Sequence, residues 1–247
     1  MNPAFPNSRI YGHRARIGYT SPPLTTEIFP YEFYKIVPDG VTLVVTTLAI
    51  VERSKSEVEQ SYAISIGSAR DGRGRRGHRR AGRGADQSFA RGEASRKNDQ
   101  RACSRARRQS LDQRVRAGAR PAKLGCKKAI VVQPYAASET DRIAGYGRHF
   151  GCEILGATAW GSAFNHLGRI PVHAALEMAR ALMREHPAAD SILLPSPHWP
   201  VIGAIDPLER EFGVNVVSAL AAVVWDALRR VGVDDRIAGY GRLLREF

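Results

Sequence analysis

The sequence of 247 residues predicts an α/β fold in which helices cover a parallel sheet. Short apolar runs rich in β-branched residues alternate with segments whose apolar residues recur at helical spacing. The alternation is clearest over residues 191–230, where two strand–helix pairs follow one another directly. Because parallel strands need a crossover connection, usually a helix, this order of elements is typical of a parallel sheet.

The first expected elements precede residue 67. Residues 41–49 (VTLVVTTLA) are β-branched and nearly continuous, which predicts a strand buried on both faces. Apolar residues at helical spacing then predict a helix over 52–66. A second apolar run, 128–135 (KAIVVQPY), predicts the next strand. The pattern then indicates a helix from Ser138 or Thr140 to about Phe150 and a strand over 152–157.

The C-terminal third has the clearest pattern. Ala, Leu and Met at helical spacing predict a helix over 172–184, and a strand over 191–195 precedes a helix that Gly213 ends. A strand over 214–218 and a helix over 219–230 complete the series. Parallel sheets bind ligands at the carboxyl ends of their strands. Four polar side chains follow such ends: Tyr135, Ser196, His198 and Ser218.

One octapeptide, DRIAGYGR, occurs unchanged at residues 141–148 and 235–242. Two related lobes would produce such a repeat. Two helix ends that use similar Gly-Tyr-Gly chemistry by chance would produce it equally well, so no inference rests on it.

The formal net charge of +13 is concentrated in one segment. Residues 61–120 hold 17 basic and 5 acidic side chains, whereas the rest of the chain holds 20 and 19 and is nearly neutral. Between Arg70 and Arg120, four apolar side chains other than alanine are present: Phe89, Cys103, Leu111 and Val115. Such a segment cannot bury enough surface to offset its ordering entropy, so we expect residues 67–122 to be disordered or misfolded.

Several classes of protein are excluded on simpler grounds. No stretch approaches 18 consecutive apolar residues, which excludes a membrane span, and residues 1–6 (MNPAFP) lack the layout of a signal peptide. The three cysteines, Cys103, Cys126 and Cys152, are odd in number and show no CxxC spacing, so neither a disulfide framework nor a zinc site is indicated. A cytoplasmic protein is therefore expected.

Six stretches of the sequence carry a resemblance to a known family. The run ILLPSPHWPVIGAIDPLEREFGVNVVSALAAVVWDALRRVGV and the later GYGRLL (239–244) resemble the maleate cis-trans isomerase and arylmalonate decarboxylase group of the aspartate/glutamate/hydantoin racemase superfamily. RIGYTSPPLTTEIFPYEF (16–33) and the following VTLVVTTLAI resemble its first strand, substrate loop and second strand. VVQPY (131–135) and LGRIP (167–171) resemble the start of its second lobe and a later helix entry.

The resemblance implies two pseudo-symmetric, Rossmann-like α/β lobes with parallel sheets and an active site between them. Residues 1–66 would begin the first lobe, 67–122 would be an Arg-rich part of it, 123–230 would form the second lobe, and 231–247 would return to the fold. The implied activity is that of an isomerase, racemase or decarboxylase acting without a cofactor at a carbon adjacent to a carboxylate. The implied substrate resembles maleate, an arylmalonate or an amino acid. The resemblance leaves open whether the chain forms a homo-oligomer.

Members of this family use one or two cysteines at strand ends, but the second-lobe position is Ser196 here. A serine hydroxyl needs an activating base, whereas a thiol can be tuned to a thiolate. His198 either supplies that base or caps a helix that begins at Trp199-Pro200. We favour a hydrogen bond from Ser196 to a carboxylate over nucleophilic attack.

The remaining site residues follow from the same resemblance. Tyr135 matches a tyrosine that binds the substrate carboxylate, the alternative being a tyrosine packed beside Pro134. Thr25 and Thr26 match the first-lobe substrate loop, the alternative being an ordinary turn. The backbone around Pro197 and the hydroxyl of Ser218 complete the expected carboxylate site, which holds no metal. Cys126 and Cys152 are expected to be buried structural thiols.

The Arg-rich segment, residues 70–120, has three interpretations: a disordered arm that binds RNA, a charged insertion, or a normal gene read in the wrong frame. Shifting each codon of residues 76–88 by one base permits a buried strand followed by a glycine loop, which is the first-lobe element that the pattern lacks. Normal patterning returns near Lys123. We favour the frameshift, because an RNA-binding arm would interleave more aromatic residues than Phe89 alone. The chain is then expected to be inactive or poorly folded, and a catalytically dead carboxylate-binding module is the further alternative.

Overall fold

The computed structural model describes residues 11–23, 26–51, 124–149 and 151–247, and the account below concerns these residues. The first part of the chain forms two strands around one helix: β1 (Ala15–Pro23), α1 (Ile28–Ile36) and β2 (Val41–Ile50). The second part contains β3 (Lys128–Gln133), the 3-10 helix η1 (Ala137–Glu139), α4 (Thr140–His149), β4 (Glu153–Ala159), the 3-10 helix η2 (Phe164–Arg169), α5 (Ala174–Glu185), β5 (Ser191–Leu194), α6 (Ile202–Phe212), β6 (Asn215–Ser218), α7 (Ala219–Arg230) and α8 (Arg242–Glu246).

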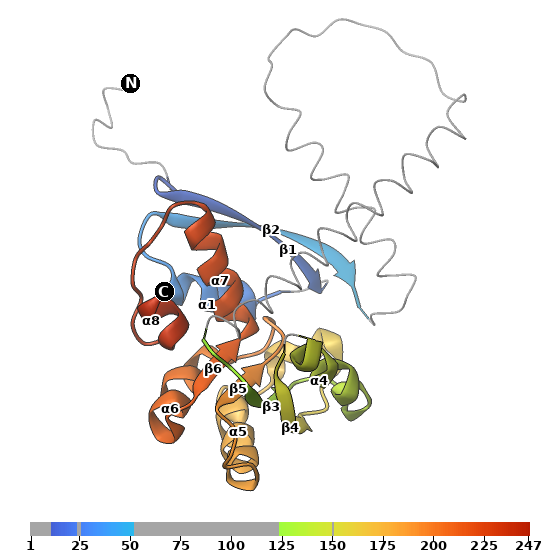
Figure 1. Cartoon of the computed structure of the whole chain (residues 1–247). Coiled ribbons are helices and arrows are strands. Elements are labelled where there is room, and N and C mark those ends of the chain that lie inside the picture. Colours follow the sequence, from blue (N-terminus) through green and yellow to red (C-terminus); the bar gives the residue numbers. More distant parts are fainter. Residues whose placement is uncertain (1–10, 24–25, 52–123, 150) are drawn as a thin grey trace, which may run out of the picture.

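The strands form two parallel sheets, which confirms the predicted fold class. β1 pairs with β2, and the other four strands have the order β4-β3-β5-β6. Helices connect the strands of the larger sheet, as right-handed crossovers between parallel strands require. Figure 1 shows the two sheets as separate layers, with α1 and α7 on the side of β1 and β2 that faces the larger sheet.

The core of the second part lies around the central strand β3. Its residues 129–132 are almost completely buried because β4 and β5 flank the strand and helices cover it. α5 contributes a stripe at helical spacing: Ala174, Ala175, Ala179, Leu182 and Met183. The apolar residues that recur at helical spacing therefore face the sheet. The predicted order of strands and helices over 128–230 is confirmed.

The prediction that residues 41–49 are buried on both faces is wrong. β2 forms at this place, but the side chain of Val44 is 51% exposed, and Thr46 and Thr47 are also exposed. Among the described residues, β2 pairs with β1 alone, so a β-branched run here reflects strand propensity without full burial. The helix expected over 52–66 lies outside the described residues.

The first part of the chain contacts the second through helices and through several polar contacts, one of which is an ion pair. α1 packs against α7. Arg14, next to β1, donates from both terminal nitrogens to the carboxylate of Asp235, which lies 221 residues later. Both side chains are about one-third exposed, so this ion pair adds little stability. The expected division at 66, 122 and 230 stays a prediction, because the segment 67–122 lies outside the described residues.

The C-terminal segment returns to the larger sheet beside α6. The amide of Ile237 donates to the carbonyl of Leu244, which closes a loop that precedes α8. The buried carboxylate of Glu209 accepts hydrogen bonds from the amides of Arg242 and Val216, and so links α6, β6 and α8. Leu243 and Leu244 are buried against this junction.

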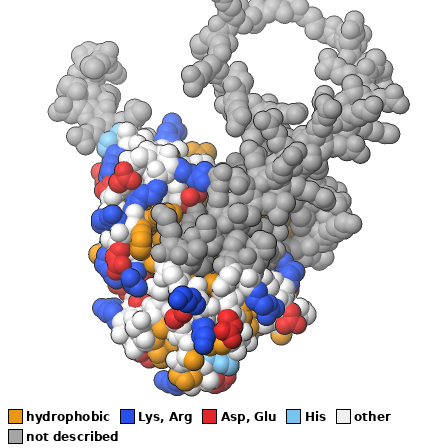
Figure 2. All heavy atoms as spheres, viewed as in Figure 1, with side chains coloured by type: hydrophobic (Ala, Val, Ile, Leu, Met, Phe, Trp, Pro, Cys, Tyr) orange, Lys and Arg blue, Asp and Glu red, His pale blue; other side chains and the backbone are white. Residues whose placement is uncertain are grey.

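The two cysteines that the structure describes are free and buried, as predicted. Cys126 precedes β3, and Cys152 lies directly before β4 rather than inside a strand. Burial raises the pKa of the Cys126 thiol to about 11, which makes it unreactive. None of the described helices is long and apolar enough to span a membrane. Basic and acidic side chains are interspersed over the described surface seen in Figure 2.

Candidate functional site

The loop between β5 and α6 contains the most unusual backbone of the described chain. Ser196 has a φ of 81°, in the left-handed region, and is the one residue other than glycine with a positive φ among the described residues. Its hydroxyl accepts a weak hydrogen bond from the amide of His198, at 3.3 Å. Non-glycine residues held in this region cost free energy and cluster at functional sites. The loop follows the carboxyl end of a parallel strand, where ligands bind in such sheets.

The start of α6 is capped by a residue from the first part of the chain. The helix begins at Ile202, and Oε1 of Glu32 accepts hydrogen bonds from the amides of Val201 (3.0 Å) and Ile202 (3.3 Å). The alternative that His198 caps a helix beginning at Trp199-Pro200 is therefore wrong. Trp199 is instead completely buried and donates from its indole nitrogen to the carbonyl of Pro195.

The imidazole of His198 contacts the hydroxyl of Tyr19 in β1, whereas its backbone amide contacts Ser196. The distance between the tyrosine oxygen and Nε2 is 3.2 Å, and both groups are removed from water. Burial lowers the pKa of His198 to about 4, so the ring is neutral at pH 7. Burial and the neighbouring Tyr135 raise the pKa of Tyr19 above its ordinary value, so its hydroxyl keeps its proton. The aromatic ring of Tyr19 stacks on that of Phe29 in α1.

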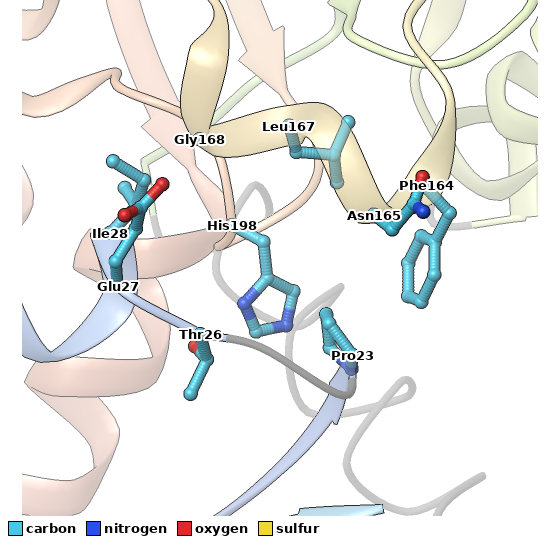
Figure 3. A pocket seen from close by; sticks show the side chains of 9 residues that line it. All are labelled: Pro23, Thr26, Glu27, Ile28, Phe164, Asn165, Leu167, Gly168 and His198. Atoms are coloured by element: carbon cyan, nitrogen blue, oxygen red, sulfur yellow. The ribbon is translucent and has the colours of Figure 1, made fainter. Parts of the chain in front are cut away.

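Beside this pair lies a small, partly open pocket between the two parts of the chain (Figure 3). Its wall combines the β1–α1 region, η2 and the β5–α6 loop. The lining residues are Pro23, Thr26, Glu27, Ile28, Phe164, Asn165, Leu167, Gly168 and His198. In Figure 3 the imidazole of His198 extends between Thr26 and Pro23.

Two polar atoms of residues that line this pocket, Oγ1 of Thr26 and Nδ1 of His198, are buried and lack a hydrogen-bond partner among the described residues. The same holds for Oγ of Ser21 and Oε2 of Glu32, which belong to residues outside the lining. Buried polar groups are nearly always hydrogen-bonded, so a concentration of exceptions marks a place where another molecule can bind. No cluster of three or more His, Cys, Asp or Glu side chains that could hold a metal ion occurs in the part of the chain described here.

The structure brings some of the predicted site residues together. His198 and Thr26 line the pocket, and Ser196 and the half-buried Pro197 lie in the same loop as His198. Tyr135 follows β3 and stacks on Phe164, one of the lining residues, with 6.3 Å between the ring centroids. Its role in carboxylate binding stays a prediction.

One other predicted residue, Ser218, lies outside the pocket wall. Ser218 is buried at the end of β6, where its hydroxyl caps α7 by accepting from the amide of Ala221. It is not one of the residues that line the pocket. Thr25 lies outside the described residues.

Two residues near the site, Tyr19 and Glu32, were not predicted from the sequence. Tyr19 contacts His198 across 179 residues, and no local pattern connects the two positions. Glu32 did leave a signal, since it falls on the apolar stripe formed by Phe29, Phe33 and Ile36 at helical spacing. A carboxylate on the buried face of a short helix needs donors from elsewhere, which the start of α6 supplies.

The fold and the pocket together define an α/β protein with parallel sheets and a candidate small-molecule site beside the β5–α6 loop. Comparison with known proteins makes this class more precise. The family model for arylmalonate decarboxylase matches residues 17–244, so the chain belongs to the arylmalonate decarboxylase family.

One curated protein and two solved structures are similar to this chain. The arylmalonate decarboxylase of Bordetella bronchiseptica is 29% identical over 129 residues, which are 50% of this chain and 52% of that protein. The aligned region thus spans about half of this curated relative. A liganded double mutant of arylmalonate decarboxylase has a similar structure, with a TM-score of 0.72, 20% identity, and coverage of 94% of this chain and 99% of the other. The maleate isomerase of Pseudomonas putida S16 gives a TM-score of 0.68 and 19% identity, over 94% and 98% of the two chains.

Proposed function

We propose that this chain is, or derives from, an enzyme that acts without a cofactor at a carbon adjacent to a carboxylate. The observation that carries the proposal is the pocket between the two parts of the chain, which the left-handed Ser196 loop borders and where buried donors lack partners. The names of the relatives indicate the reaction class, decarboxylation of an arylmalonate or cis–trans isomerisation of maleate. The comparisons lend no support to nucleic-acid binding.

The state of Ser196 favours a second candidate, a carboxylate-binding module without turnover. The imidazole of His198 contacts Tyr19, and the Ser196 hydroxyl is held by a backbone amide, so no base activates the hydroxyl among the described residues. An unactivated serine binds a carboxylate well but exchanges protons poorly with carbon. A thiol has an ordinary pKa of about 8.5, far below that of a serine hydroxyl, and nearby positive charge or a base can lower it further.

The two candidates are separated by Ser196→Cys. The chain and the variant are incubated with phenylmalonate and with maleate, and binding is followed by the shift in melting temperature and turnover by proton NMR. We expect both proteins to be stabilised by phenylmalonate and the variant to form product at least about tenfold faster, since a thiol can protonate the carbanion left when CO₂ departs.

Ser162→Cys, in an exposed loop, controls for an added thiol elsewhere. Binding without turnover in Ser196→Cys would favour the binding module. Absence of any thermal shift with either carboxylate would contradict both candidates.

The first-lobe part of the proposal concerns residues 67–122, which lie outside the described residues. We propose that they are a frame-shifted part of the first lobe. The nucleotide sequence across codons 66–126 tests this directly, since two compensating single-base shifts are expected. An uninterrupted frame in independent isolates, together with salt-dependent RNA binding, would contradict it.

A further inference from the structure

One placement of the protons gives the buried Tyr19 hydroxyl an acceptor on His198. The O–H of Tyr19 needs an acceptor because buried hydroxyls are seldom left unpaired. Among the described residues, Nε2 of His198 is the acceptor at hydrogen-bond distance, 3.2 Å away. If Nε2 accepts, it carries no proton, and a neutral imidazole must then carry its proton on Nδ1.

The other side of the ring points to a guest molecule. Nδ1 is buried and has no partner among the described residues, and the same holds for Oγ1 of Thr26. Both side chains line the pocket, and in Figure 3 Nδ1 lies on the side of the ring toward Thr26. Burial denies both groups bulk water, so an acceptor atom of a bound molecule is what would satisfy them.

We infer that Tyr19 holds His198 as its neutral Nδ1–H tautomer, and that this N–H and the Thr26 hydroxyl form a donor pair for a carboxylate bound in the pocket. The inference rests on the proposed function for its ligand class. It makes His198 a binding residue and Tyr19 a positioning residue. The lone pair of Nε2 is occupied by Tyr19, so His198 does not act as the base for Ser196.

A neutral donor pair suits a carboxylate in this place better than a cation does. Burial lowers the pKa of His198 to about 4, so a protonated ring would be costly even before the ligand arrives. Hydrogen bonds from neutral donors to an anion are charge-assisted and strong, and they require no buried cation when the pocket is empty of substrate. Glu27 also lines the pocket, and its carboxylate lies beside Gly168 of η2 (Figure 3).

The tautomer is measured by NMR of the full chain labelled with ¹⁵N in the histidine rings. The spectrum of His198→Gln identifies the His198 signals. We expect Nδ1 to show the chemical shift of a protonated ring nitrogen and Nε2 that of an unprotonated one, without any ligand added. A protonated Nε2 in this spectrum would overturn the inference.

The role of Tyr19 is tested by Tyr19→Phe, which removes the hydroxyl and keeps the stacked ring. We expect the proton to redistribute toward Nε2 and the dissociation constant for phenylmalonate to rise about tenfold, the loss of one charge-assisted hydrogen bond. Tyr11→Phe, at a tyrosine that is 92% exposed, is the matched control and should change neither quantity. An unchanged tautomer and an unchanged affinity in Tyr19→Phe would overturn the role of Tyr19. If this variant fails to fold, the spectrum of the unaltered chain still decides the inference.

The ligand half is tested by titrating the labelled chain with phenylmalonate and, as a neutral control, with its dimethyl ester. We expect the chemical shift of Nδ1 to change on addition of the diacid and to remain unchanged on addition of the ester. Failure of the proposed function appears as the absence of a thermal shift with phenylmalonate. Failure of this inference appears as an Nδ1 signal that does not move during a titration that does raise the melting temperature.

Discussion

Ser196 combines backbone strain with a hydroxyl at the end of β5. Its φ of 81° is a conformation that glycine adopts freely and serine does not. The hydrogen bond that its hydroxyl accepts from the His198 amide is long, at 3.3 Å, and compensates the strain only in part. The side chain is buried, so the strain is retained at a place where the hydroxyl can contact a bound ligand.

We predict that Ser196→Gly raises the free energy of unfolding by up to about 1 kcal/mol, because glycine removes the strain. The same variant should bind phenylmalonate more weakly, since the hydroxyl is lost. Urea denaturation and ligand titration measure the two effects. Ser162→Gly, where φ is not positive, is expected to be neutral or destabilising. A loss of stability in Ser196→Gly would show that the hydroxyl outweighs the strain.

At the scale of elements, Glu32 fixes the start of α6 against α1. One carboxylate oxygen accepts from the two free amides at the helix start, and the other has no partner among the described residues. Burial raises the pKa of Glu32 to about 7 from an ordinary 4.5, although the two amides oppose this shift. Because this helix start follows the Ser196 loop, the protonation of Glu32 bears on the shape of the site.

Because its pKa is raised, Glu32 lowers the free energy of unfolding as the pH rises. The folded state binds its proton more tightly than the unfolded chain does, so stability is fully present below pH 4.5 and is lost as the pH rises to 7. Glu32→Gln keeps an acceptor oxygen but cannot ionise. We predict that its stability relative to the unaltered chain improves by about 3 kcal/mol between pH 4.5 and 7.

Urea denaturation at several pH values checks this difference, with exposed Glu185→Gln as the control. His198 also makes stability depend on pH: because its pKa is lowered, it destabilises the folded state as the pH falls below 6.5. This contribution is the same in both proteins, so it cancels in the difference between them. A difference that stays constant with pH would show that Glu32 is ionised in the folded protein across this range.

At the scale of the whole molecule, the repeated octapeptide DRIAGYGR adopts two different conformations. Residues 141–148 lie inside α4, whereas residues 235–241 are non-helical and include one turn before α8, which begins at Arg242. In the second copy, Gly239 and Gly241 have φ values of 92° and 90°, and the carboxylate of Asp206 accepts from the amide of Gly241. The repeat therefore does not reflect the same structural element in two lobes.

The first glycine of each copy provides a matched pair for mutation. A Cβ atom would meet nothing within 4 Å at Gly145 or at Gly239, so packing is the same and the backbone alone differs. We predict that Gly145→Ala stabilises the protein by up to about 1 kcal/mol, since alanine favours a helix interior, and that Gly239→Ala destabilises it by about 1 kcal/mol or more. Thermal denaturation measures both, and equal signs would contradict the assigned conformations.

Local sequence was sufficient for most elements of the second part. α7 coincides with its predicted range 219–230, and Gly213 ends α6 in the left-handed conformation that its position suggested. These features depend on apolar periodicity and on a single glycine, which are properties of neighbouring residues. The resemblance to the family contributed the prediction of two lobes and drew attention to Ser196. Two predictions were wrong: that His198 caps a helix, and that the strand over 41–49 is buried on both faces.

The sequence by itself thus determined a parallel α/β protein of the arylmalonate decarboxylase type, with polar residues at strand ends. Tertiary structure alone decided which of those residues meet. Tyr19 pairs with His198 and Glu32 caps α6 because the first part of the chain packs on the second, across 179 and about 170 residues. The two copies of one octapeptide fold differently for the same reason, since non-local contacts to Asp206 and Glu209 hold one of them in a mainly non-helical conformation. Eight identical residues contain no information about such distant partners.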